Sequence, residues 1–142
     1  MRITKFGHAC VRIESGSTTV VLDPGGWTEP DAVRGAGAVL VTHEHPDHLD
    51  PGNLRAADAP IYTIDAVARA IAEQAPDLSE RVTVVAPGDR LELGVPVSVV
   101  GEKHAVIHPE LPRFDNSGYL LEVEGRRIFH PGDALTEQPG EL

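Results

Sequence analysis

The chain has 142 residues, 41% hydrophobic and 4% aromatic, which is enough for one domain with an aliphatic core over residues 1–142. Its formal net charge of −10 opposes attraction to nucleic acid or to an anionic membrane, so we expect neither as a partner. The single cysteine, Cys10, excludes an internal disulfide, and the N-terminus MRITKFGHAC lacks the apolar stretch of a signal peptide, so we expect a cytoplasmic protein.

The N-terminal part of the chain alternates short β-rich runs with turn residues, which predicts a meander of strands. Its three predicted strands are 2–6, 9–14 and 18–23. The residues DPGG (23–26) end the third strand. A short helix is then predicted at 30–35, and the apolar run AVLVT predicts a buried strand at 38–42.

The rest of the chain predicts two helices and a further set of strands. The first helix is 51–57. The second is 65–75, with Asp65 placed to cap its N-terminus and Pro76 just past its end. Its apolar stripe is Val67, Ala70, Ile71 and Gln74. The strands are 60–64, 81–85, 90–93, 95–100, 118–124 and 126–130, with a loop at 101–117.

Three of the seven histidines lie in the stretch THEHPDHLD (42–50), directly after the predicted buried strand. In a turning backbone His43 and His45 can face one centre, and neutral imidazole is a good ligand for Zn²⁺. Asp47 and His48 can face a second centre beside it. A histidine-rich solvated loop is the alternative, but the order H-x-H-x-D-H favours a metal site.

The motif HEHPDH (43–48) resembles the signature of the metallo-β-lactamase fold superfamily of metal-dependent hydrolases. Residues 2–24 are similar to the three-strand start of the branch that contains the ascorbate-6-phosphate lactonases. VVGEKH (99–104) and IFHPGDA (128–134) are similar to its third-histidine and Gly-Asp segments. The resemblance covers nearly the whole chain and implies an α/β (α+β) fold, the metallo-β-lactamase αββα sandwich. It is specific for fold and metal binding but not for substrate.

The resemblance implies two groups of metal ligands. His43, His45 and a later histidine would bind the first metal; that histidine is His104, with His108 as the competitor. The second metal would be held by Asp47, His48 and a bridging aspartate, Asp133. The implied metal is Zn²⁺, one ion or two, with Mn²⁺ or Fe as alternatives. Taken alone, Pro131-Gly132-Asp133 could also be an ordinary turn.

Other residues have weaker expected roles near the metals. In the resemblance, Asp23 accepts hydrogen bonds that support residues 43–48, here called the metal loop. A strand-end turn cap is an equally good interpretation of Asp23. His8 would lie at the rim of the cleft, with a purely structural histidine as the alternative. For His130 we expect a packing role with its side chain directed away from the Gly-Asp turn, and for Cys10 a place in the core.

The implied activity is hydrolysis of a small-molecule ester, lactone or phosphate ester by a metal-activated hydroxide that Asp47 orients. A catalytically impaired metal-binding or interaction module is the alternative. A nuclease would need a basic nucleic-acid-binding insertion, and the sequence has none.

After Asp133 the sequence has only nine residues, ALTEQPGEL, whereas the branch continues and supplies one more histidine to the second metal. We therefore expect the C-terminal half of the sandwich to be incomplete. We also expect two apolar groups, Val97/Val99 and Leu120/Leu121/Val123, to be partly uncovered. An identical chain could cover them, so a homo-oligomer is expected.

Overall fold

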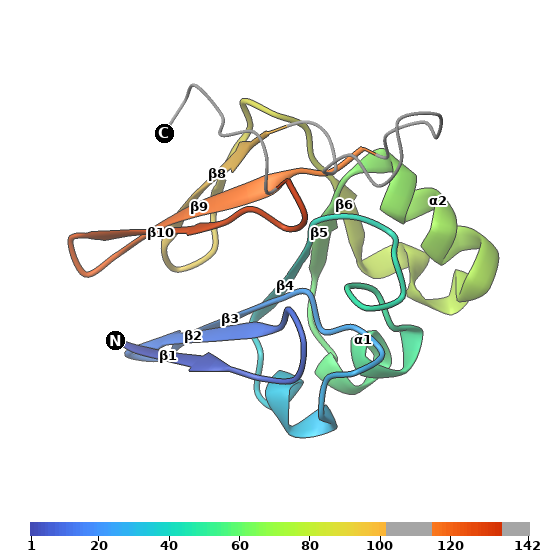
Figure 1. The fold of residues 1–142 in the computed structure, drawn as a ribbon, viewed down its shortest axis with the longest axis horizontal. Helices are drawn as coiled ribbons and strands as arrows, with labels where there is room; N and C mark the ends of the chain where they lie inside the picture. Colours follow the sequence, from blue (N-terminus) through green and yellow to red (C-terminus); the bar gives the residue numbers. More distant parts are fainter. Residues whose placement is uncertain (102–114, 135–142) are drawn as a thin grey trace.

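The computed structural model describes residues 1–101 and 115–134, so His104 and His108 lie outside the described residues. In these segments two β-sheets pack face to face, and helices cover the outer face of the larger sheet (Figure 1). The larger sheet follows chain order: β1 (Arg2–Lys5), β2 (Val11–Ser15), β3 (Thr18–Leu22), β4 (Ala38–Val41), β5 (Ile61–Thr63) and β6 (Val82–Val84).

The smaller sheet is antiparallel and has the order β10-β9-β8-β7. Its strands are β7 (Arg90–Glu92), β8 (Pro96–Val100), β9 (Gly118–Val123) and β10 (Arg126–His130). The helical elements are η1 (Pro30–Val33), α1 (Pro51–Ala57), α2 (Asp65–Gln74) and η2 (Pro76–Arg81), where η denotes a 3-10 helix. The strand and helix order predicted from the sequence is confirmed, and the mixed α/β class with it.

Strand direction in the larger sheet decides where the DPGG turn (23–26) and the histidine-rich stretch (42–50) lie. β1, β2 and β3 form the expected antiparallel meander. From β3 to β6 the strands run parallel, so their carboxyl ends meet at one edge of the sheet. The DPGG turn after β3 and the histidine-rich stretch after β4 are therefore brought together at this edge.

Two buried apolar clusters hold the layers together. One joins the helices to the outer face of the larger sheet, with Leu54 and Ile71 packed near Val39 and Ile61. The other lies between the sheets. Its buried residues are Ile13, Val20, Leu22, Leu40, Val85, Val95, Val97, Val99, Tyr119, Leu121 and Val123. The central strands β3 and β4 face both clusters, which explains why β4 and the second half of β3 are continuously apolar.

The prediction that two apolar groups of the smaller sheet are partly uncovered is wrong. All five residues are buried: Val97, Leu121 and Val123 are 0% exposed, Val99 1% and Leu120 7%. Four of them belong to the cluster between the sheets, where they meet residues of β2, β3 and β4 from the same chain. The apolar face of the smaller sheet is thus covered by the larger sheet of the same chain.

Helix α2 differs from its expected form at both ends. Its N-cap is Ile64, which makes no side-chain capping bond, and Asp65 is the first helical residue. There Asp65 pairs with Arg69 one turn later, 2.5 Å away. Gln74 is exposed rather than part of the apolar stripe. The 3-10 helix η2 was not predicted; it begins at Pro76, where proline suits a first helical turn.

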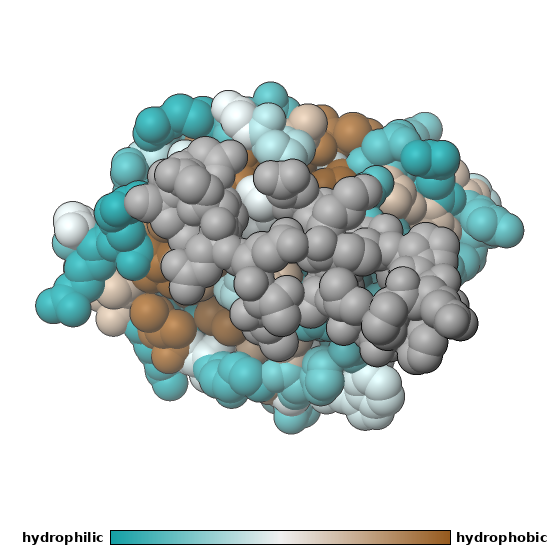
Figure 2. Space-filling view, turned by 45° about the horizontal axis from the view of Figure 1, so that its top comes forward, coloured by the Kyte–Doolittle hydropathy of each residue, from teal (hydrophilic) through white to brown (hydrophobic). Residues whose placement is uncertain are grey.

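The surface is mixed rather than uniformly polar. In the described part of the chain, neither α-helix is long and apolar enough to cross a membrane. Figure 2 shows hydrophilic residues around much of the visible rim and hydrophobic groups between them. Within residues 1–101 and 115–134, the large hydrophobic side chains that are exposed are Met1, Ile3, Trp27 and Val84.

Candidate metal centre

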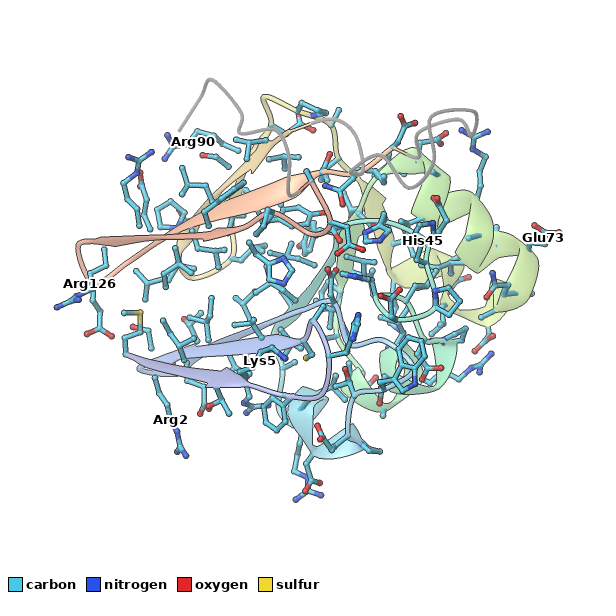
Figure 3. The ribbon with its side chains drawn as sticks, in the orientation of Figure 1. Arg2, Lys5, His45, Glu73, Arg90 and Arg126 are labelled. Carbon is cyan, nitrogen blue, oxygen red and sulfur yellow. The ribbon has the colours of Figure 1, made fainter. Side chains whose placement is uncertain are left out.

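The candidate centre lies at the carboxyl edge of the parallel strands. His43 to His48 follow β4 directly and turn back, because the amides of His48 and Leu49 both donate to the carbonyl of His45, at 2.8 and 2.9 Å. Asp50 then ends the turn by accepting from the Asn53 amide and capping α1. Figure 3 shows His45 at the end of the sheets opposite Arg2 and Arg126.

Asp23 is the buried anchor of this edge. Its carboxylate accepts from the Thr42 amide (2.8 Å), the Thr42 hydroxyl (2.7 Å) and Nδ1 of His48 (2.6 Å). Burial alone would raise the pKa of Asp23, but the bond from His48, the nearby His130 and the bond from Thr42 hold that pKa below its usual value. Asp23 is therefore an ionised acceptor at neutral pH.

These hydrogen bonds fix the tautomers of two histidines. The Thr42 hydroxyl has one proton, which it gives to Asp23, so it must accept from Nδ1 of His43, 2.8 Å away. His48 likewise donates its Nδ1 proton to Asp23. In the neutral form both rings then carry their lone pair on Nε2, which is the atom a metal ion would use.

Both Nε2 atoms face the carboxylate of Asp133. The Nε2 of His48 lies 3.2 Å from Oδ1 of Asp133, and the Nε2 of His43 lies 3.5 Å from its Oδ2. Oδ2 of Asp47 is 3.4 Å from Nε2 of His48. The Nε2 of His48 is buried and has no hydrogen bond among the described residues. Lone pairs that converge in this way repel one another unless a cation lies between them, so the donor set fits a metal ion.

The pKa shifts of His43 and His48 agree with a cation-binding site. Burial and the neighbouring His48 lower the pKa of His43 to about 4, so its imidazole is neutral at neutral pH. For His48, burial acts to lower the pKa, but the bond to Asp23 and the charges of Asp23, Asp133 and Asp47 raise it overall. The carboxylates therefore favour a positive charge beside His48, whether a proton or a metal ion carries it.

The structure brings most of the expected residues together. Possible ligand atoms lie within 4.8 Å of one another in three groups: His43/His45/Asp47, His43/His48/Asp133 and His8/Asp47/His48. His8 donates to the ionised Asp47, with Nε2 to Oδ2 at 2.6 Å. Whether His104 or His108 is the third ligand of the first metal stays a prediction. Cys10 is 0% exposed and packs in the cluster under the helices, as expected.

The expectation for His130 is wrong. Its Nε2 bonds the Ala9 carbonyl at 3.0 Å, while its Nδ1 accepts from the Gly132 amide at 3.2 Å and lies 3.9 Å from Asp23. The side chain thus turns toward the Gly-Asp turn. Strand alternation did not predict this, because β10 ends at His130 and the chain bends there.

Sequence reasoning missed Asn116, which holds the Gly-Asp turn. Its side-chain oxygen accepts from the Asp133 amide at 3.1 Å, and its nitrogen donates to the Pro131 carbonyl at 2.9 Å. Gly132 has a φ of 61° and lies so close to Thr42 and Asn116 that a Cβ could not be accommodated. The sequence showed only an Asn two residues before the predicted strand 118–124, which is a weak signal.

Comparisons with known proteins agree with this architecture. A model of the Beta-lactamase superfamily domain matches residues 2–141. Protein Rv0786c of Mycobacterium tuberculosis is 40% identical over 147 residues, covering 99% of this chain and 67% of that protein. A UPF0173 metal-dependent hydrolase of Methanosphaerula palustris is 31% identical over 142 residues, covering 94% of this chain and 60% of that protein.

Solved structures show the same fold. The chain aligns with a candidate metal-dependent hydrolase from Parabacteroides distasonis at a TM-score of 0.72 and 23% identity, covering 92% of this chain and 59% of that one. The chain thus spans between 60% and 67% of the length of the two curated relatives above. By its match to the family model over nearly its whole length, this chain belongs to the beta-lactamase superfamily, and it has the metallo-β-lactamase fold.

Proposed function

We propose that the chain is the metal-binding part of a metal-dependent hydrolase that acts on a small-molecule ester, lactone or phosphate ester. The observation that carries this proposal is the convergence of the Nε2 atoms of His43 and His48 on the two oxygens of Asp133. The name of the Methanosphaerula relative, a metal-dependent hydrolase, supports the reaction class. No substrate follows from the fold alone.

In this proposal His43, His45 and His104 or His108 would hold the first ion. Asp47 and His48 would hold the second, and Asp133 would be a ligand in both. Zn²⁺ suits the imidazole-rich set, with Mn²⁺ or Fe as alternatives. Such ions, when bound, supply a hydroxide nucleophile at neutral pH and polarise the bond under attack.

The chain's own residues orient and hold protons around that chemistry. In this proposal Asp47 accepts a hydrogen bond from the attacking water. Burial acts to raise the pKa of Asp47, but the charge of His48 and the bond from His8 lower it overall, so its carboxylate is ionised and can accept. Asp23 keeps the Nδ1 proton of His48 in place. Thr42 does the same for His43.

The ascorbate-6-phosphate lactonase-like branch supplies the first substrate class to test, a lactone or a phosphate-bearing small molecule. The second candidate is a metal-binding module with impaired catalysis. It needs only the donor groups, whose possible ligand atoms lie within 4.8 Å of one another.

The test combines metal content per chain with a hydrolysis screen on lactone, phosphodiester and β-lactam substrates. Bound metal together with turnover of one class supports the hydrolase. Bound metal without turnover in any class supports the metal-binding module. A chain that binds no divalent metal overturns both readings.

A further inference from the structure

His8 lies outside the metal motif HEHPDH in the sequence, but in the structure it lies beside two of the candidate metal ligands, Asp47 and His48. It belongs to the turn between β1 and β2, and its Nε2 reaches Oδ2 of Asp47 at 2.6 Å. Its ring is 5.8 Å from the ring of His48, edge-on, and 5.3 Å from that of Trp27, centre to centre. The possible ligand atoms of His8, Asp47 and His48 all lie within 4.8 Å of one another.

The turn holds His8 in this position by several contacts. Its φ is 60°, a conformation that few residues other than glycine adopt and that is often found where a ligand is held. Its carbonyl accepts from Nζ of Lys5. On the preceding residue, the Gly7 carbonyl accepts from the Thr28 hydroxyl at 3.0 Å. The imidazole is therefore presented to Asp47 by a turn that is tied to the 23–29 loop.

The neighbour of His8 in this group points to a ligand. The Nε2 of His48 belongs to a fully buried side chain, has no hydrogen bond among the described residues, and is directed at the carboxylates of Asp47 and Asp133. Those two carboxylates and the Nε2 of His48 are three oxygen and nitrogen donors. A fourth donor would complete a tetrahedral Zn²⁺ site.

We propose that His8 is a ligand of the second metal position, together with Asp47 and His48. The inference rests on the proposed function, because it adds one ligand to the same centre. His8 is half-exposed, so its ring can take the tautomer with the proton on Nδ1, hydrogen-bonded to water. The lone pair of Nε2 is then available to the ion instead of a proton shared with Asp47. The β1–β2 turn then supplies a ligand that none of the motif segments contains.

Long-range ¹H–¹⁵N NMR of the histidine side chains tests this in the unaltered chain during a Zn²⁺ titration. We expect the Nε2 of His8 to move from the protonated to the metal-bound shift at the second equivalent, with Nδ1 protonated. The His8→Asn variant assigns the signal, because Asn tolerates a positive φ. If Nε2 of His8 stays protonated while His43 or His48 becomes metal-bound, only this inference fails. If no histidine changes, the proposed function fails as well.

A second measurement compares Zn²⁺ affinity in the presence of a competing chelator. We expect His8→Asn to weaken binding of the second equivalent by roughly tenfold or more and to leave the first unchanged. The matched control is Trp27→Phe, which alters the ring beside His8 without touching a ligand, and both equivalents should bind as before. Equal loss in the two variants would overturn the inference, because packing of the turn would then explain it.

Discussion

At the scale of single residues, the candidate centre depends on which nitrogen of each histidine carries the proton. Asp23 and Thr42 lie just outside the cluster and accept the Nδ1 protons of His48 and His43. Removing such a partner leaves every candidate ligand present, but it changes which ring nitrogen carries the proton and so whether Nε2 is free to bind a metal. The partner residues should therefore matter nearly as much as the ligands.

Replacing Asp23 with Asn should weaken metal binding by about 10-fold to 100-fold. The amide nitrogen would donate to Nδ1 of His48 and move the ring proton to Nε2, where a metal would bind. Isothermal titration with Zn²⁺ measures the change. Asp89→Asn is the matched control, because Asp89 caps another Pro-Gly-Asp turn by accepting from Ala86. Unchanged affinity in Asp23→Asn would contradict the tautomer argument.

The same carboxylate predicts an acid dependence of stability in the metal-free chain. The folded pKa of Asp23 lies below its ordinary value of 3.8. Its contribution is therefore present above that ordinary value and is lost as the pH falls through the folded pKa. The advantage of the native chain over Asp23→Asn in free energy of unfolding should shrink on acidification below about pH 3.8. Urea unfolding with a chelator, followed from pH 7 to pH 3, measures it.

Asp47 and His45 separate catalysis from metal binding. Asp47→Asn should remove most turnover in an active form of the protein and leave the first metal bound, because the amide keeps the shape but cannot accept a proton. His45→Ala should instead lower bound metal sharply. Metal analysis and initial rates on the same samples distinguish the two. Full metal content in His45→Ala would exclude it as a ligand, and full turnover in Asp47→Asn would make Asp47 structural.

At the scale of elements, two loops at the carboxyl edge are in backbone contact. Gly25, after β3, packs against the backbone of Asp47 and His48, and the amide of Gly26 donates to the Pro46 carbonyl at 2.7 Å. Asn53 of α1 donates to the carbonyls of Gly25 and Thr28, at 3.0 and 3.1 Å. The position of Asp47 and His48 is thus determined by a loop that lies earlier in the chain.

Gly25→Ala should displace the metal loop, because its Cβ would lie only 2.5 Å from the amide nitrogen of His48. We expect a loss of about 1–3 kcal/mol in unfolding free energy and weaker metal binding. Gly26→Ala is the control: its Cβ would meet only the Pro46 carbonyl oxygen, at 3.3 Å, and the loss should be smaller. Equal effects of the two substitutions, measured by chemical denaturation, would contradict the close-approach argument.

At the scale of the whole molecule, the two sheets are joined by buried polar contacts of Tyr119 as well as by apolar packing. The Tyr119 hydroxyl of β9 donates to the Val41 carbonyl of β4 at 2.7 Å. This carbonyl also accepts from the Thr63 hydroxyl at 2.9 Å. Val41 directly precedes Thr42 and the metal motif, so the smaller sheet contacts the strand end that presents the candidate ligands.

Tyr119→Phe should therefore destabilise the chain by about 1 kcal/mol and no more, because Val41 keeps its bond from Thr63 and no cavity forms. Urea unfolding measures the difference. Tyr62→Phe, at a half-buried tyrosine of β5, is the comparison, since its hydroxyl makes no bond within the described residues. A loss of several kcal/mol for Tyr119→Phe would mean that the hydroxyl organises more than this contact.

The oligomeric state is the remaining prediction at this scale. The faces first expected to drive association are buried, but the edge strands β1 and β6 carry exposed Ile3 and Val84, at 52% and 51%. Unpaired strand edges are templates for pairing with another chain. We propose that the chain forms a homodimer or larger assembly. Light scattering that gives a monomer mass at all concentrations would reject this.

The amino-acid sequence by itself determined the order of the strands and helices and the position of the metal motif. Both are local properties: alternation and turn residues act over a few positions, and HEHPDH places its own members within one turn. The predictions that were wrong concern non-local properties. The cover over Val97 and Leu121 and the direction of His130 depend on contacts with distant segments.

Only the tertiary structure decided which distant residues complete the centre. The resemblance suggested Asp23 and His8, each with an ordinary structural role as the alternative, and Asn116 was not expected. The contacts of all three with the centre come from separate segments. Parallel pairing of β3 with β4 brings Asp23 beneath His48. The backbone contact of Gly25 positions the metal loop, and the bend after β10 brings the Gly-Asp turn to the same site. Pairing and packing are non-local, so no local pattern encodes them.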